Sequence, residues 1–171
     1  MSVPKGDRGE SAAQFLDTAR EIRIFTQDRA KRLPNREVPY EGRLLARASY
    51  DIFQKIVTAN NIKVRTLGDA EERLRLFNVA EANLKALAAE IDVLADILRR
   101  AAAEEQARLK AENERREKEG QPPLRSKIKP LKGGTLLNWH QLIGDEIKLL
   151  EGVQKAELRK YREKFGPDAF K

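Results

Sequence analysis

Apolar residues recur every three or four positions along most of the chain, a spacing that predicts amphipathic α-helices. The first helix is expected over residues 11–33, where Ser11 and Gln14 have the spacing of a capping box. A second is expected from about residue 40 to 61, with Pro39 suited to its first position because proline has no N–H to leave unpaired. The predicted apolar stripes are Phe15, Ala19, Ile22 and Thr26 in the first helix, and Leu45, Ala48, Ile52, Ile56 and Ala59 in the second.

The clearest periodicity begins after Asp69 and Glu72, which repeat the capping signature. Apolar steps of three and four alternate there for more than three heptads, and such a seam requires a partner helix. A fourth helix is expected from Thr135, directly after Gly133 and Gly134. The predicted stripes are Leu74, Phe77, Ala80, Leu84, Leu87, Ile91, Leu94 and Leu98 in the third helix, and Leu136, Trp139, Ile143, Ile147, Leu150 and Val153 in the fourth.

Between residues 99 and 132 the apolar stripe fades into a run of Ala, Glu, Lys and Arg, followed by the helix breakers Gly120, Pro122 and Pro123. This charged arm is either a solvated extension of the third helix or a mobile segment. The whole pattern predicts an all-α fold, an up-down-up-down four-helix bundle with this long charged insertion between helices three and four. The bundle is expected over residues 11–165, between disordered ends at 1–10 and 166–171.

Residue types suited to catalysis are scarce. The chain has no cysteine, which excludes a Cys-based zinc site, and its one histidine, His140, has Leu137 rather than a glutamate three positions before it. The stretch from Lys132 to Thr135 precedes a helix but lacks the spacing of a nucleotide-binding loop. Trp139 lies on an apolar stripe and is expected in the core. We therefore expect a protein that is not an enzyme and uses no metal or cofactor.

The chain is also expected to stay away from membranes. Residues 1–10 are polar, and no stretch approaches the ~20 apolar residues of a membrane span. A cytoplasmic location is the expectation that follows.

Positive charge is concentrated in two parts of the chain. The net charge is +7, which attracts polyanions, although a surface that serves only solubility would have the same excess. Residues 23–47 contain seven basic residues against three acidic ones, and residues 99–132 contain eleven against six. No acidic residue lies within 125–132, so Arg125, Lys127, Lys129 and Lys132 are candidate phosphate contacts. Aromatic residues make up only 6% of the chain, which argues against recognition by base stacking.

Four stretches have the form of motifs that occur together in one protein family. They are Phe25-Thr26-Gln27 through Lys31-Arg32-Leu33-Pro34, Pro39-Tyr40-x-Gly42-Arg43-Leu44, Ala48 to Ala59-Asn60, and Ala82-Asn83-Leu84-Lys85-x-Leu87. In these the chain resembles the accessory variability determinant (Avd) proteins of diversity-generating retroelements, relatives of the four-helix proteins encoded in ribosomal RNA intervening sequences. Two features depart from the family: Leu150-Glu151-Gly152-Val153 stands where a Gly-Gly-Trp stretch is common, and the arm between helices three and four is much longer.

The resemblance implies a homopentamer of four-helix protomers that binds a reverse transcriptase and its template RNA. Such a protein supports mutagenic complementary-DNA synthesis without catalysing it. By the same resemblance, the first candidates for nucleic-acid contacts are Arg29, Lys31, Arg32, Arg36, Arg43 and Arg47.

The residues alone leave a second function open, a structural oligomeric scaffold that binds only proteins. Phe53 and Val57 in the second helix lie off the main stripe, as do Leu142 and Leu149 in the fourth. Exposed apolar patches of this kind usually mark association, so an oligomer is expected under either function.

Overall fold

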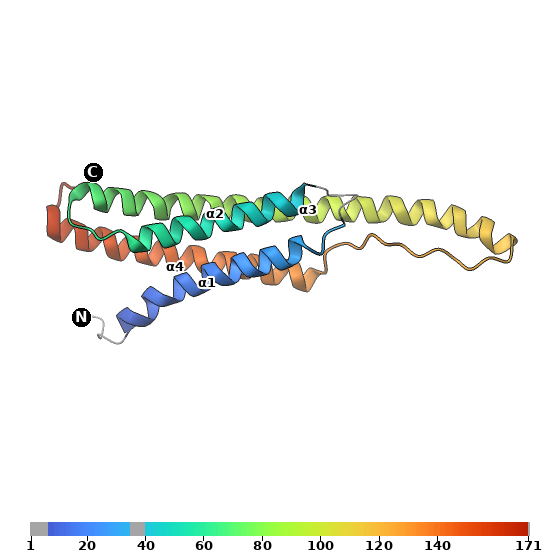
Figure 1. The fold of residues 1–171 in the computed structure, drawn as a ribbon, viewed down its shortest axis with the longest axis horizontal. Coiled ribbons are helices and arrows are strands. Elements are labelled where there is room, and N and C mark those ends of the chain that lie inside the picture. Colours follow the sequence, from blue (N-terminus) through green and yellow to red (C-terminus); the bar gives the residue numbers. More distant parts are fainter. Residues whose placement is uncertain (1–6, 35–39, 171) are drawn as a thin grey trace.

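The computed structural model describes residues 7–34 and 40–170, with side chains from Gln14 onward. In these ranges the chain forms four helices, α1 (Asp7–Ala30), α2 (Glu41–Asn61), α3 (Leu67–Lys118) and α4 (Gly133–Phe165). Each helix packs against the one before it, and α4 closes the ring against α1 (Figure 1). The predicted all-α four-helix bundle is therefore confirmed. Within the described ranges, none of the helices has an apolar stretch long enough to span a membrane.

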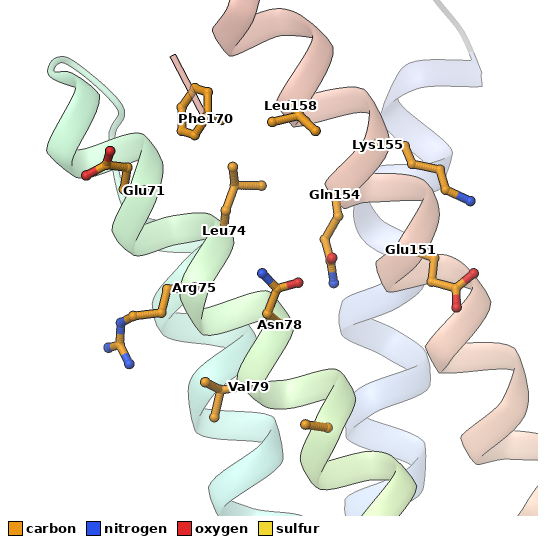
Figure 2. Close-up of a pocket in the computed structure, with 11 residues that line it drawn as sticks. Glu71, Leu74, Arg75, Asn78, Val79, Glu151, Gln154, Lys155, Leu158 and Phe170 are labelled. Atoms are coloured by element: carbon orange, nitrogen blue, oxygen red, sulfur yellow. The ribbon is translucent and has the colours of Figure 1, made fainter. Parts of the chain in front are cut away.

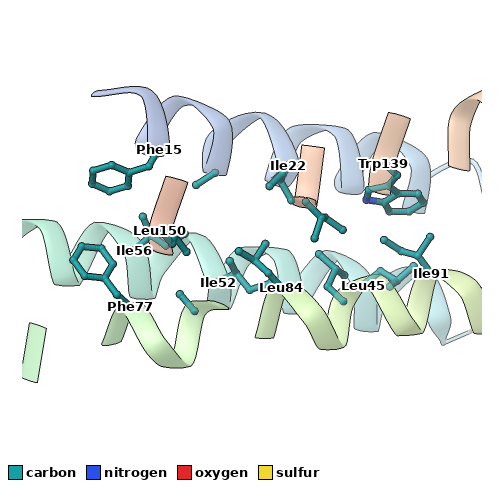
Figure 3. Packing of buried hydrophobic residues seen from close by; sticks show 14 of the residues in the cluster. Phe15, Ile22, Leu45, Ile52, Ile56, Phe77, Leu84, Ile91, Trp139 and Leu150 are labelled. Atoms are coloured by element: carbon teal, nitrogen blue, oxygen red, sulfur yellow. The ribbon is translucent and has the colours of Figure 1, made fainter. Parts of the chain in front are cut away.

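The core lies between the four helices and is built largely from the predicted stripes (Figure 3). The rings of Phe15 and Phe77 meet edge to face with their centroids 5.9 Å apart. Further along the bundle, the indole N–H of Trp139 donates to the hydroxyl of Thr26 at 2.9 Å, and Phe25 packs edge to face on the indole. Trp139 is fully buried with its N–H satisfied, which confirms its predicted place in the core.

Both predicted capping boxes are wrong in detail. α1 already begins at Asp7, so Ser11 lies inside the helix and not at its N-cap. The N-cap of α3 is Thr66, whose hydroxyl accepts the backbone N–H of Asp69 at 3.2 Å. The Asp69 carboxylate accepts the N–H of Thr66 at 2.8 Å, so Asp69 is the third residue of the box rather than its cap.

The start of α2 near Tyr40 agrees with the prediction, whereas the start of α4 differs from it. α2 begins at Glu41 with Tyr40 as its N-cap, and Pro39 lies outside the described residues. α4 begins at Gly133 instead of Thr135. Gly133 and Gly134 predict a break before the helix, because glycine is unfavourable in a helix interior. In the first turn this cost is smaller, because the N–H groups there have no intrahelical partner to lose.

Several stripe positions are shifted. In α4 it is Glu146, not the half-buried Ile147, that is fully buried, and in α2 Ser49 is buried beside the half-buried Ala48. A helix of 3.6 residues per turn produces such one-residue shifts over several turns. Leu74 is also only half-buried, at the end of α3 where the bundle begins.

The prediction of apolar patches at the off-stripe positions is wrong. Phe53, Leu142 and Leu149 are half-buried and pack against the core of their own chain, and Val57 is half-buried as well. The exposed large apolar side chains are Ile24, Tyr40, Leu44, Tyr50, Leu67, Val93, Leu124 and Leu137.

α3 is much longer than the bundle. Its 52 residues correspond to about 78 Å, and its last buried residue is Ala102. Residues 103–118, the α3 extension, project from the bundle, and residues 119–132, the return segment, run back beside it to α4 (Figure 1). The turn between them requires Gly120, whose φ of 71° is unfavourable for other residues. The charged arm is predicted to be either an extension of the third helix or a mobile segment. Residues 99–118 form the helical extension, and residues 119–132 are not helical.

At the opposite end of the bundle, Arg73 joins three segments. Its guanidinium donates to the carbonyl oxygens of Asn60 and Ile62 at 3.1 and 3.2 Å, and its Nε lies 3.4 Å from a Glu157 carboxylate oxygen. The α2–α3 loop, α3 and α4 are therefore held together by one half-buried cation. α4 ends at Phe165, as predicted, and the ring of Phe170 beyond it lies 6.1 Å from that of Tyr161.

Candidate nucleic-acid interface

The last turn of α1 and the first turn of α2 are in close contact at the end of the bundle from which α3 projects (Figure 1). Gly42 makes this approach possible, because a Cβ there would lie 3.0 Å from the carbonyl oxygen of Ala30 and 3.5 Å from the Leu33 side chain. Basic residues that follow α1 and open α2 are consequently presented on neighbouring surfaces.

We call Arg29, Lys31, Arg32, Arg43 and Arg47 the bundle-end cluster. The last four are exposed, and Arg47 lies 3.9 Å from Asp51 in an exposed ion pair. Lys31, Arg32 and Arg43 form no ion pair with any described residue, so their charge is available to a ligand. Arg36, the remaining candidate of this group, lies outside the described residues.

Arg29 differs from the rest of the bundle-end cluster. It is half-buried, and its guanidinium carbon lies 4.8 Å from the centroid of the Phe25 ring, which in turn packs on Trp139. A cation stacked in this way stabilises the end of the bundle. Arg29 therefore has a packing role that the sequence did not reveal.

The return segment supplies the other predicted cations. Arg125, Lys127, Lys129 and Lys132 are all exposed, and none forms an ion pair within the described part of the chain. Lys132 is the N-cap of α4 and follows Leu131, which packs against the core. The bundle-end cluster and the return segment therefore meet where α4 begins.

Side chains of the α3 extension fix the position of the return segment. Near the tip, the Asn113 side chain donates to the Leu124 carbonyl at 3.0 Å and accepts the Leu124 N–H at 2.6 Å. Closer to the bundle, one oxygen of Glu105 accepts the Ser126 hydroxyl and the backbone N–H groups of Lys127 and Ile128, the latter two at 3.1 and 3.0 Å.

Sequence reasoning missed Glu105 and Asn113. Both lie in a run of Ala, Glu, Asn and Arg that resembles an ordinary solvated helical face. Their partners are 11 to 23 residues away, so no local spacing signals the contact. The one related signal in the sequence is the acid-free basic stretch 125–132, which suggests a carboxylate partner elsewhere in the chain but does not identify it.

Basic residues also occur at the opposite end of the bundle, where Lys63, Arg65 and Arg159 are exposed. Several of their neighbours have other partners. Lys160 lies 3.9 Å from Glu157, and the Lys164 ammonium donates to the Val64 carbonyl at 3.0 Å. The opposite end is thus the natural control for any experiment on the bundle-end cluster.

A groove of about 650 Å³ lies between the start of α3 and the end of α4, at the end opposite the bundle-end cluster (Figure 2). Leu74 and Leu158 lie on its two sides, and Phe170 stands at its end. It is mainly apolar and contains none of the predicted contact residues. The residues that line it are Glu71, Leu74, Arg75, Asn78, Val79, Ala82, Glu151, Gln154, Lys155, Leu158 and Phe170.

Within residues 7–34 and 40–170, no group of three or more histidine, aspartate or glutamate side chains could hold a metal ion. His140, the one histidine, is partly exposed and bonds to Asp92 with its Nε2 2.9 Å from the carboxylate. No family model, curated protein or solved structure matches the chain.

Proposed function

We propose that the protein is a non-catalytic, basic accessory that binds nucleic acid through the phosphate backbone. One observation carries the proposal: apart from Arg36, every predicted contact residue lies at one end of the bundle or on the segment that returns to it. Residues distant in the sequence therefore present their charge on one continuous part of the molecule. Apart from Arg29, which stacks on Phe25, and Arg47, which pairs with Asp51, these residues form no ion pair within the described part of the chain. Grouped cations of this kind raise the local concentration of polyanions.

The chemistry of the bundle-end cluster and the return segment favours phosphate over bases. Arginine presents a planar fork that matches phosphate oxygens, and three of the exposed residues, Arg32, Arg43 and Arg125, can use it. Residues 99–132 contain no aromatic residue on which a base could stack, and the exposed Tyr40 at the start of α2 could offer only the sequence-tolerant stacking that any base makes. Binding is therefore expected to be independent of sequence.

The resemblance to the Avd proteins supports a finer proposal. The nucleic acid would be template RNA and its complementary DNA, and the protein partner a reverse transcriptase whose mutagenic synthesis supports retrohoming of a diversity-generating retroelement. A homopentamer is proposed on the same ground. A neighbouring gene for a reverse transcriptase, with a template and variable repeat pair, is the observation that would support this finer proposal.

The bundle-end cluster is tested by changing Lys31, Arg32 and Arg43 together to glutamine. Each lost contact with a single strand flattens the slope of log K against log salt by about 0.7, so the triple variant should lose about 2. Helicity should not change, because these side chains are exposed. Fluorescence anisotropy with a labelled single-stranded RNA at several salt concentrations measures the slope.

The matched control changes Lys63, Arg65 and Arg159 to glutamine, which removes the same charge from the opposite end of the bundle. Its slope should stay close to that of the wild type. An equal loss in both variants would show that net charge, not the bundle-end cluster, determines binding.

A protein-binding scaffold remains the alternative, and one observation favours it. Ile24, Leu44, Val93 and Leu137 are exposed by 53%, 64%, 52% and 69%, and each lies on a different helix. Exposed apolar side chains on every helix suit a protein that associates through several faces. This alternative predicts an oligomer by light scattering together with no retention of RNA or DNA.

A further inference from the structure

The return segment is almost fully extended beside the α3 extension. Its contacts at Leu124 and Ile128 pair with Asn113 and Glu105, so four residues of the segment span eight residues of helix. Eight helical residues rise about 12 Å, and four extended residues cover about 13 Å. The two lengths agree only if the segment is close to its full extension and antiparallel to α3.

Successive side chains of an extended chain point to opposite sides. Ser126 and Ile128 are half-buried toward α3, and their hydroxyl and N–H groups are bound by Glu105. Arg125, Lys127 and Lys129 alternate with them and are exposed. The exposures therefore place the three cations on the side of the segment that faces away from the helix. Their spacing is not that of an ideal strand, because the consecutive N–H groups of Lys127 and Ile128 meet the same Glu105 oxygen.

We infer that this row, the arm ladder of Arg125, Lys127 and Lys129, binds consecutive phosphates of one single strand of nucleic acid in an extended conformation. The inference rests on the proposed function and specifies the form of nucleic acid that the arm accepts. Exposed cations that follow one another along the outer side of the segment can each meet a phosphate of a strand that runs beside it. A single strand can straighten to follow the row, whereas phosphates in a duplex wind around its axis.

The dimensions of the arm disfavour a duplex groove. A helix with its side chains is about 10–12 Å wide, and the return segment adds to this width. The B-DNA major groove is about 12 Å wide and is filled by one helix alone. The major groove of A-form RNA is narrower still. The arm therefore offers its outer row of cations to a strand that lies along it.

Glu105 is a positioning residue in this arrangement. Its carboxylate holds three consecutive residues of the return segment and leaves the three ladder side chains unpaired. The nearby carboxylates of Glu112 and Glu119 lie 3.8 and 3.4 Å from Arg115 and are partly neutralised by it. Glu105 thus orders the ladder without pairing with its side chains, and Glu112 and Glu119 pair with Arg115 instead.

The direct test changes Arg125, Lys127 and Lys129 to glutamine in the full chain. The probe is a labelled single-stranded RNA of about 16 nucleotides, the upper site size of single-strand binding folds, with a duplex of equal length for comparison. The variant should bind the single strand about 100-fold more weakly at about 50 mM salt, with a slope flatter by about 2. Duplex binding should change much less.

The variant with Lys63, Arg65 and Arg159 changed to glutamine is again the control. If the ladder variant binds the single strand as this control does, the inference is overturned while the proposed function stands. If the duplex loses as much affinity as the single strand, the assignment to a single strand is wrong. If the wild-type protein retains neither probe, both the inference and the proposed function fail.

A second test separates positioning from charge. Glu105→Ala and Glu105→Gln remove the same negative charge, and simple charge summation predicts tighter binding by both. We expect Glu105→Ala to bind the single strand about tenfold more weakly, because the freed segment must lose backbone entropy on binding. Glu105→Gln keeps an oxygen acceptor and should bind more tightly than Glu105→Ala. If Glu105→Ala bound the single strand as tightly as the wild type or more tightly, with an unchanged thermal melt, the positioning role would be contradicted.

Discussion

At pH 7, changing Glu146 to glutamine is expected to raise the free energy of unfolding by about 3 kcal/mol. The Glu146 side chain is 0% exposed, and neither of its carboxylate oxygens has a hydrogen-bond partner among the described residues. Burial raises the pKa of this carboxyl from 4.5 to about 9. The folded protein therefore keeps the proton at pH 7, while the unfolded chain releases it and is stabilised by ionisation.

The sign of the pH dependence follows from the two pKa values. Because the folded-state pKa is higher, the unfolded chain binds fewer protons between pH 4.5 and about 9, and stability falls as pH rises through this range. At pH 7 the loss is about 3 kcal/mol, from about 1.36 kcal/mol for each unit above the unfolded pKa. Glutamine is equally polar in the core but has no proton to release, so the variant should lack this dependence.

Urea unfolding followed by circular dichroism at about pH 5, 7 and 8.5 measures the effect. The gap between Glu146→Gln and the wild type should be small at the lowest pH and widen with each step. Glu163→Gln, at an exposed position on α4, is the control and should stay within about 0.5 kcal/mol of the wild type. A wild type that gains stability from pH 5 to pH 8.5 would mean that the buried carboxyl is ionised and paired.

Changing Arg73 to methionine is expected to lower the free energy of unfolding by about 3 kcal/mol, because it leaves a carboxylate and two carbonyl groups without their partner. Methionine has an aliphatic stem of similar length, but it also removes the guanidinium that lies 5.5 Å from the centroid of the Phe77 ring, so the loss includes this cation–π contact. Glu157 would keep only the Tyr161 hydroxyl and the distant Lys160. Burial, together with the bond to Glu157, raises the pKa of Tyr161, so this hydroxyl remains a donor.

Arg75→Met is the matched control, since Arg75 lies on the same helix and donates to both oxygens of Glu72 at 2.6 and 2.7 Å on the surface. Exposed pairs of this kind contribute about 0.2–1 kcal/mol. Chemical denaturation of both variants at neutral pH gives the comparison. Equal losses would show that Arg73 is no more than a surface cation, contrary to its position at the junction of three segments.

Helical periodicity was sufficient to predict the bundle. The stripes of α1 and α3 are buried as expected, apart from the half-buried Leu74, because a continuous apolar face on a helix is stabilised by packing against its neighbours. Glu146 and Ser49 were missed for the opposite reason, since a polar residue on a core face breaks the pattern used to find that face. The ends of the helices were placed least well, because caps such as Thr66 depend on backbone geometry beyond local residue type.

The candidate site could be predicted as a set of residue types but not as a surface. The excess of basic residues in 23–47 and 99–132 is plain in the sequence, yet only the fold shows that both segments meet where α4 begins. Arg29 could not be separated from its exposed neighbours, because its stacking on Phe25 depends on packing around Trp139. Glu105 could not be found, because its partners approach only through the return segment.

The most direct test of the central claim is a salt titration of the wild-type protein with single-stranded RNA. The six exposed, unpaired cations of the bundle-end cluster and the arm ladder, at about 0.7 each, predict a slope of about −4 for log K against log salt, and a steeper one if Lys132 contributes or if copies associate. The six are Lys31, Arg32, Arg43, Arg125, Lys127 and Lys129. Tight binding at about 50 mM salt that falls along this slope, with little difference between RNA sequences, is the predicted result. No retention at that salt concentration, or a slope near zero, would contradict the claim and favour a scaffold that binds only proteins.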